Sequence, residues 1–146
     1  MKKDSDYQHW IKSKFGGASA KESIDLIVES LLMEAKQYVL PIKLSSVAKI
    51  IGIDPKPLYF DQPYDGSLIT TDDKIRIALS LNFRQNNRYS QRLRFTYAHE
   101  LIHCLAYDFS CLPNKRIAPL PDRQEEEHLC NYGAAKLMLP KRVLLG

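Results

Sequence analysis

Two histidines four residues apart, with a glutamate directly after the first, are the residues of this chain best suited to chemistry. They are His99, Glu100 and His103, in the segment RFTYAHELIHCLAY. Because a helix turns by about 100° per residue, both rings would lie on one face and could reach the same metal ion. Glu100 would lie beside that face, where it can hold a metal-bound water rather than the ion itself. The spacing therefore indicates a hydrolytic zinc site with Glu100 as general base.

A hydrolytic zinc site usually has three protein ligands and one open position, so a third ligand is needed. The candidates lie in the downstream segment RQEEEHLCNYGAAKLM. Helical phase favours Glu127, because the residues that share its stripe are small or apolar and suit an inward face. Glu126 lies at the border of that face, and His128 and Cys130 are the remaining alternatives.

Two interpretations without catalysis compete with this one. Cys104, Cys111 and Cys130 could complete a closed, structural zinc site with the two histidines. Glu100 would then have no role, and Cys104 would point about 100° away from His103 on the helix. Alternatively, the histidines could be ordinary polar members of a partly buried helix. Three cysteines without a framework spacing fit small core or loop residues in a reducing compartment better than they fit disulfides.

Apolar residues at helical spacing predict the elements that carry these side chains. The predicted helices cover roughly residues 20–39, a short segment from Ser45 or Ser46 to Gly52, residues 91–106 and residues 122–139. Ser19 and Glu22 have the spacing of a capping box at the start of the first helix. The third helix contains the histidine motif and the fourth contains Glu127. The site therefore requires that these two helices pack together.

The middle of the chain changes to the alternating pattern of strands. Short strands are predicted at residues 58–60 and 67–70, and a longer one over residues 74–81 after a turn at Asp72-Asp73. Apolar residues alternate with basic or small ones in the last strand. We therefore expect an α+β fold in which a small antiparallel sheet, with one buried face and one basic solvated face, packs against several helices.

Length and composition indicate a single domain. A chain of 146 residues, 45% hydrophobic and 26% charged, is typical of one soluble globular domain. Residues 1–18 are expected to be a loose or partly helical lead-in, and residues 19–146 the domain. Loops are predicted at residues 82–90 and 107–121. The N-terminus lacks the apolar run of a secretory signal, and no segment has the length to span a membrane, so we expect a cytoplasmic protein.

The net charge of +4 does not by itself indicate a nucleic-acid partner. Basic residues are concentrated between Asp73 and Glu100, where no acidic residue occurs; they are Lys74, Arg76, Arg84, Arg88, Arg92 and Arg94. A solvated basic face is favoured over a docking surface for an acidic partner. The segment VAKIIGID could begin a helix-turn-helix, but Pro55 and Pro57 stand where the recognition helix would start. Direct DNA binding is therefore not expected.

The two motifs together resemble those of the ImmA/IrrE family of bacterial and phage metallopeptidases. In that family, a helix with the pattern R-F-T-x-A-H-E-L-x-H is followed by E-x-x-[AC]-N-x-F-A-A-x-L-L-M-P. This chain has RFTYAHELIH from Arg94 and EHLCNYGAAKLMLP from Glu127. The resemblance covers roughly residues 24–140, and the paired motifs are far more specific than the histidine motif alone.

The resemblance implies a zincin-like metallopeptidase core. One zinc ion per chain would be held by His99, His103 and Glu127, with Glu100 as general base. The implied substrates are helix-turn-helix transcriptional repressors, which are cleaved to switch on stress-response or mobile-element genes. The alternative is a zinc-binding anti-repressor that binds its repressor without cutting it. Family members generally continue with further helices, so this chain is expected to lack the family's C-terminal helices.

Two positions depart from the family pattern. Ile102 replaces the glycine that usually precedes the second histidine, so the adjoining backbone is expected to pack less closely. Gly133 replaces a phenylalanine, which removes an aromatic ring from the core beside Glu127.

Two further parts of a peptidase site stay open at the level of sequence. Tyr97, Tyr107, Tyr132 or His128 could stabilise the oxyanion, and nothing in the sequence ranks them. The strand at residues 74–81 could offer its edge to an extended peptide substrate.

Overall fold

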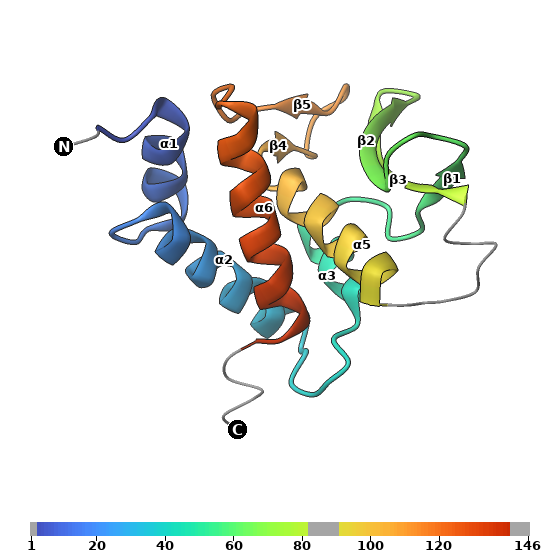
Figure 1. The fold of residues 1–146 in the computed structure, drawn as a ribbon, viewed down its shortest axis with the longest axis horizontal. Coiled ribbons are helices and arrows are strands. Elements are labelled where there is room, and N and C mark those ends of the chain that lie inside the picture. Colours follow the sequence, from blue (N-terminus) through green and yellow to red (C-terminus); the bar gives the residue numbers. More distant parts are fainter. Residues whose placement is uncertain (1–2, 82–90, 141–146) are drawn as a thin grey trace.

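The computed structural model describes residues 3–81 and 91–140, and the fold is α+β (Figure 1). The elements in chain order are α1 (Asp6–Phe15), α2 (Ala20–Glu34), α3 (Leu44–Ile51), β1 (Leu58–Phe60), β2 (Gly66–Thr71), β3 (Lys74–Ser80), α5 (Gln91–Cys104), β4 (Tyr107–Asp108), β5 (Lys115–Arg116) and α6 (Arg123–Met138). The predicted loop at residues 82–90, with Arg84 and Arg88, lies outside the described residues. Within the described ranges, no helix is both long enough and apolar enough to cross a membrane.

Helix α1 forms a regular part of the structure near the N-terminus. The side chain of Ser5 accepts a hydrogen bond from the backbone of Gln8, and the side chain of Gln8 accepts one from the backbone of Ser5, which is a complete capping box. Tyr7 and Ile11 of this helix are buried and belong to the hydrophobic core. The segment predicted as a loose or partly helical lead-in therefore contributes to the packing of the domain.

The next two helices are close to their predicted positions, except that the first of them ends five residues earlier than predicted. Helix α2 begins after Ser19, whose hydroxyl accepts a hydrogen bond from the backbone N–H of Glu22 at 3.1 Å, and it ends at Glu34, earlier than predicted. Helix α3 ends at Gly52, where a φ of 105° requires the left-handed conformation that glycine tolerates. The prediction of a serine cap for α3 is wrong, because Lys43 precedes the helix without a side-chain cap.

The three-stranded sheet is mixed, so the prediction of an antiparallel sheet is wrong in part. Its order is β1-β3-β2. Strands β2 and β3 form an antiparallel hairpin, and Asp72 and Asp73 in its turn both have positive φ values, as a tight hairpin turn requires. Strand β1 pairs with the other edge of β3 and runs parallel to it, with Leu58 opposite Ala78. Alternating apolar residues show which faces are buried, but not the neighbour or direction of a strand.

Strand β3 is buried on more than the one predicted face. Its alternating isoleucine and leucine side chains are buried, as predicted. Ala78 and Ser80, which point to the opposite face, are buried as well. Only the exposed Lys74 and the half-buried Arg76 leave that face basic, so the solvated basic face is restricted to the start of the strand.

The segment predicted as one long loop between α5 and α6 contains a second, two-stranded sheet. Strands β4 and β5 pair antiparallel, with Tyr107 opposite Arg116. Asn114 connects this pair to the β2–β3 hairpin: its N–H donates to the carbonyl of Asp73 at 2.8 Å, and its side-chain oxygen accepts from the N–H of Ile75 at 2.9 Å. Strands of two residues are too short to leave an alternating pattern in the sequence.

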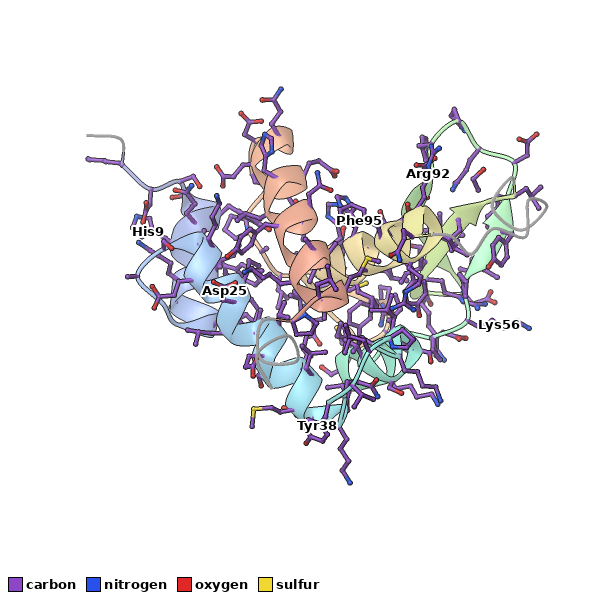
Figure 2. All side chains as sticks on the ribbon, turned by 60° about the horizontal axis from the view of Figure 1, so that its bottom comes forward. His9, Asp25, Tyr38, Lys56, Arg92 and Phe95 are labelled. Atoms are coloured by element: carbon purple, nitrogen blue, oxygen red, sulfur yellow. The ribbon has the colours of Figure 1, made fainter. Side chains whose placement is uncertain are left out.

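Helices α5 and α6 pack directly against each other, and α6 also packs against α2 (Figure 1). Figure 2 shows Asp25 on α2. In the contact between α2 and α6, the hydroxyl of Tyr132 lies 2.9 and 3.0 Å from the two carboxylate oxygens of Asp25. Cys104 and Cys130 are free and buried between the helices, and Cys111 is free and partly exposed. All three are thus without disulfides, as expected from the sequence.

The two departures from the family pattern, Ile102 and Gly133, face each other across the α5–α6 interface. A Cβ atom added at Gly133 would lie 2.8 Å from Cγ1 and 2.9 Å from Cδ1 of Ile102, and 3.1 Å from Cγ2 of Ile24. Ile102 therefore fills the space that a larger side chain at position 133 would need. A large residue at position 102 thus faces a small one at position 133, the reverse of the sizes in the ImmA/IrrE pattern that the sequence resembles.

We expect Gly133→Phe to destabilise the protein by at least about 1–3 kcal/mol, because a ring would overpack the α5–α6 interface. The double variant Ile102→Gly, Gly133→Phe should show a favourable coupling of about 1–3 kcal/mol relative to the sum of the single changes. Urea unfolding of the four proteins in the cycle measures this coupling. Additive effects would contradict the proposed complementarity of the two positions.

Candidate metal centre

Helix α5 places the two motif histidines one turn apart, as the sequence predicted. Their ring centroids are 4.8 Å apart with an interplanar angle of 71°, and the two Nε2 atoms lie 3.1 Å from each other. Both rings are largely buried, with 12% of the His99 side chain and 16% of the His103 side chain exposed. The same nitrogen of each ring therefore points to one position.

Glu127 of α6 meets both histidines at this position. Its Oε2 lies 3.0 Å from Nε2 of His99, and its Oε1 lies 2.9 Å from Nε2 of His103. The carboxylate is 47% exposed, so it is the most solvent-accessible of the three side chains. The structure thus brings together the side chains of His99, His103 and Glu127 from two helices that are distant in the sequence.

The distances between these donor atoms suit a zinc ion. A tetrahedral ion with bonds of about 2.0–2.1 Å places its ligands about 3.3–3.4 Å apart, a few tenths of an ångström beyond the separations found here. Two imidazole nitrogens and a carboxylate oxygen are also a donor set typical of catalytic zinc. The residues present therefore fit this metal without rearrangement of the helices.

Cys130 provides a second potential donor beside the histidines. The group formed by His99, His103 and Cys130 could hold a metal ion, since their ligand atoms all lie within 4.8 Å of one another. Cys130 is only 1% exposed, and burial raises the pKa of its thiol well above its ordinary value. The sulfur would have to lose a proton in this buried position to bind a metal ion, whereas the carboxylate of Glu127 already lies 2.9 and 3.0 Å from the two rings.

The two histidines differ in their electrostatic environment. Burial lowers the pKa of His99, and the neighbouring His103 acts in the same direction. Burial also opposes the charged form of His103, but its hydrogen bond to Glu126 and the charges of Glu100, Glu126 and Glu127 raise its pKa overall. In the metal-free protein, His103 is therefore the ring for which a proton competes more strongly with a metal ion.

Glu100 is buried beside the donor atoms, with 5% of the residue exposed. Burial raises its pKa to about 7; the charge of His103 opposes this shift, and those of Glu127 and Glu126 add to it. Gly66 of β2 lies close to it, because a Cβ atom there would come within 2.7 Å of Cγ2 of Thr96 and 3.4 Å of Cγ of Glu100. A carboxyl group with this pKa can both accept and release a proton near neutral pH.

The metal-free protein should lose stability as the pH rises, and Glu100 should account for much of this loss. The pKa of Glu100 is raised from 4.5 to about 7 in the folded state, so the folded state holds this proton more tightly than the unfolded chain. The contribution of the protonated group is complete below the lower value and is lost as the pH rises to the higher one. Glu100→Gln should therefore be more stable than the wild type by up to about 3 kcal/mol near pH 8, and by little near pH 4. Urea unfolding of the chelator-treated proteins tests this, and an unchanged pH dependence would contradict it.

Glu126 and Arg116 complete the surroundings of His103, and neither role is predictable from the sequence. Oε1 of Glu126 lies 3.1 Å from Nδ1 of His103, and Arg116 binds both carboxylate oxygens of Glu126, at 3.1 and 3.0 Å. Helical phase had placed Glu126 only at the border of the inward face. Arg116 lies in the segment predicted as a loop, where nothing indicated that it would return to the site.

A cavity of about 710 Å³ opens over the three donor atoms and Glu100. Residues 66–68 of β2 form one side of it, and Tyr64 and Tyr107 also line it. Among the described strands, β2 is at the edge of its sheet, whereas β3 is paired on both sides. The prediction that the strand at residues 74–81 offers an edge to a substrate is therefore wrong, because β3 is the central strand of the described sheet.

The tyrosines considered as oxyanion-stabilising residues differ in whether they line this cavity. Tyr97 is buried and donates its hydroxyl to the carbonyl of Pro55 at 2.6 Å, and the hydroxyl of Tyr132 bonds to Asp25. Neither of these two residues lines the cavity, and neither does His128. Tyr107 does line it, together with Tyr64, which the sequence had not singled out.

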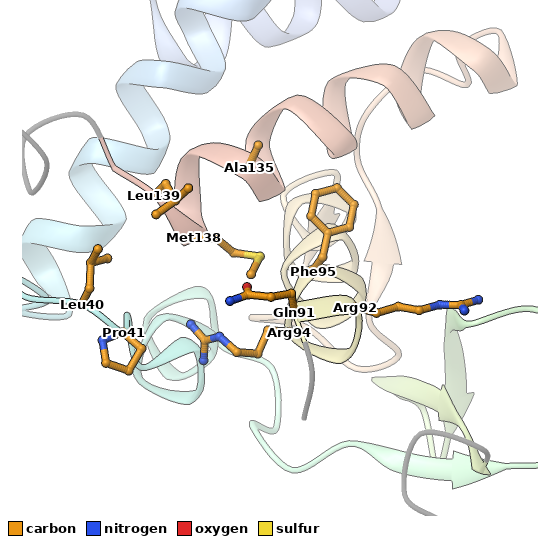
Figure 3. Close-up of a pocket in the computed structure, with 9 residues that line it drawn as sticks. All are labelled: Leu40, Pro41, Gln91, Arg92, Arg94, Phe95, Ala135, Met138 and Leu139. Carbon is orange, nitrogen blue, oxygen red and sulfur yellow. The ribbon is translucent and has the colours of Figure 1, made fainter. Parts of the chain in front are cut away.

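A second cavity, of about 790 Å³, lies around the start of α5 and the end of α6 (Figure 3). It is lined by Leu40, Pro41, Gln91, Arg92, Arg94, Phe95, Ala135, Met138 and Leu139. None of these nine residues is a histidine, cysteine or carboxylate, so this cavity offers no metal ligand. The candidate site for chemistry is the more polar cavity at the histidines.

Compared with models of known protein families, with characterised proteins and with solved structures, the chain shows no significant match. The functional assignment therefore depends on the residues and geometry of the site.

Proposed function

We propose that this chain is a zinc-dependent endopeptidase of the ImmA/IrrE type. One zinc ion per chain would be bound by His99, His103 and Glu127, with Glu100 as general base. The proposed substrate is a partner helix-turn-helix repressor in the cytoplasm, whose cleavage switches on stress-response or mobile-element genes. The observation that carries this proposal is the convergence of two Nε2 atoms and one carboxylate within 2.9–3.1 Å of each other.

The proposed mechanism divides the work between the ligands and Glu100. When bound, zinc would supply Lewis-acid chemistry: it would lower the pKa of a water molecule toward neutral and polarise the peptide carbonyl. Glu100 does not belong to the group of donor atoms, so its carboxylate is available to take a proton from the attacking water. Its raised pKa suits the next step, in which it delivers this proton to the nitrogen of the leaving amine.

The edge of β2 supports a peptide as the substrate. Within the described residues, no strand pairs with the outer edge of β2, so an extended peptide could pair there and pass over the proposed zinc position in the cavity. Tyr107 and Tyr64 line the same cavity and are the candidates for a hydroxyl that stabilises the oxyanion. Backbone pairing would bind the peptide in register, while its scissile carbonyl faces the metal.

The proposal is tested by incubating the purified protein with candidate helix-turn-helix repressors, beginning with any that is encoded beside its gene. With zinc bound, mass spectrometry should find two repressor fragments that add up to the full chain plus one water. Removal of the metal by a chelator should stop cleavage, and added zinc should restore it. Release of an intact repressor from its operator, without fragments, would instead support the anti-repressor alternative.

A further inference from the structure

The ring of His103 is contacted on both nitrogens. Its Nε2 lies at the proposed zinc position, and its Nδ1 lies 3.1 Å from Oε1 of Glu126. A carboxylate at Nδ1 favours the tautomer that carries the proton there, which leaves the lone pair of Nε2 free for a metal ion. Only 10% of the Glu126 side chain is exposed, so water competes little for this hydrogen bond.

Glu126 is itself restrained by a two-pronged ion pair. Nη1 of Arg116 lies 3.1 Å from Oε1 of Glu126, and Nη2 lies 3.0 Å from Oε2. The same guanidinium donates from Nε to the carbonyl of Ala118 at 3.2 Å and from Nη2 to the carbonyl of Pro119 at 3.1 Å. Its carbon atom also lies 5.7 Å from the centre of the Tyr107 ring. These contacts fix the guanidinium plane against the backbone that follows β5.

We propose that Glu126 is a positioning residue that sets the tautomer and the ring orientation of His103, and that Arg116 anchors it from the β4–β5 segment. This inference rests on the metal-binding part of the proposed function. Glu126 does not contact the zinc position; it acts through the imidazole. The segment between α5 and α6 therefore contributes to metal affinity, although it supplies none of the proposed ligands.

Zinc affinity tests the proposal directly. Glu126→Ala should weaken zinc binding by about 10–100-fold, the range typical for partners of metal-bound histidines. Glu126→Gln should lose less, about threefold or more, because its amide oxygen can still accept the Nδ1 proton but lacks the charge. Competition with a chromophoric chelator measures each dissociation constant, and urea unfolding of the metal-free variants verifies that they are folded.

Glu125→Ala is the matched control on the same helix. Its carboxylate accepts a hydrogen bond from the hydroxyl of Ser5 at 2.6 Å and makes no contact with His103. This variant also removes one negative charge next to the site, so it separates the effect of charge from that of the hydrogen bond. Its zinc affinity should stay within about twofold of the wild type, since it lies outside the ligand's hydrogen-bond chain.

Nitrogen NMR of the His103 ring is a second readout, and it would not change if Glu126 had a purely structural role. In zinc-loaded wild type and Glu125→Ala, nitrogen NMR should show His103 bound through Nε2 with a slowly exchanging proton on Nδ1. In Glu126→Ala this proton should exchange with water too fast to be observed. Should the alanine variant not fold, the affinity and the Nδ1 proton of Glu126→Gln decide the question.

The outcomes separate this inference from the function on which it rests. If the wild type binds zinc and the folded Glu126 variants bind it equally well, the positioning role is overturned and the metal site remains. Persistence of the protected Nδ1 proton in Glu126→Ala would overturn it as well. If the wild type binds no zinc, the proposed function fails, and this inference fails with it.

Discussion

Glu100→Gln should lower kcat/KM for repressor cleavage by about 100-fold or more, while one zinc ion stays bound per chain. Glutamine has nearly the same shape, so the buried position beside His99 is preserved. It cannot accept a proton from water, and it cannot return one to the leaving amine. The loss should therefore appear in the catalytic rate rather than in zinc content, which metal analysis of the purified variant measures.

Glu125→Gln is the control for this experiment, because it makes the same chemical change two residues before the proposed ligand Glu127, at a carboxylate that bonds to Ser5. It should cleave the repressor at the rate of the wild type. Cleavage by zinc-loaded Glu100→Gln at the wild-type rate would exclude Glu100 as the general base. De-repression by Glu100→Gln without cleavage would favour a binding function, since binding does not need the proton transfer.

Glu127→Ala should weaken zinc binding by more than about 100-fold, which exceeds the usual effect of residues around the ligands. Cys130→Ala should leave the affinity within a few-fold of the wild type. The carboxylate lies 2.9 and 3.0 Å from the two rings, and the thiol of Cys130 is buried, which raises its pKa and disfavours the thiolate that would bind the metal. Chelator competition on both variants compares the two potential third ligands directly.

The opposite pattern would identify Cys130 as the third ligand. In that case Cys130→Ala would lose zinc, and the cobalt-substituted wild type would show a thiolate-to-metal absorption band. Such a site would be formed by His99, His103 and Cys130. The position of a metal-bound water relative to Glu100 would then differ from the one proposed with Glu127 as ligand. Retention of zinc by Glu127→Ala would point to the same conclusion.

Helical regions of the fold and site could be predicted because a helix imposes one period on its residues. The spacing of the histidine motif and the helical phase of α6 depend only on local sequence. The candidate site then requires only that α5 and α6 pack against each other. The end of α3 at Gly52 was likewise readable, since few residues tolerate its backbone conformation. These features share one property: each is decided within about two turns of chain.

Features that depend on contacts between distant segments could not be predicted in the same way. The parallel pairing of β1 with β3 depends on which edge is free, and the alternation of side chains is the same for either edge. Helical phase alone puts Glu126 at the border of the inward face of α6. Its burial depends on Arg116, which approaches from a different segment. The buried carboxylate of Glu126 is stabilised there by Arg116 and by His103, and the sequence of α6 alone does not reveal either partner.

The reversed pair Ile102 and Gly133 has a consequence for engineering. Because these residues lie in close contact between the helices that carry the histidines and Glu127, we expect that neither helix can be transplanted alone. Grafting an α5 with glycine at position 102 would put glycine opposite Gly133 and leave a void. Grafting an α6 with phenylalanine at position 133 would press its ring against Ile102. A chimera would have to inherit both helices as one cassette to keep its ligands in reach of a shared ion.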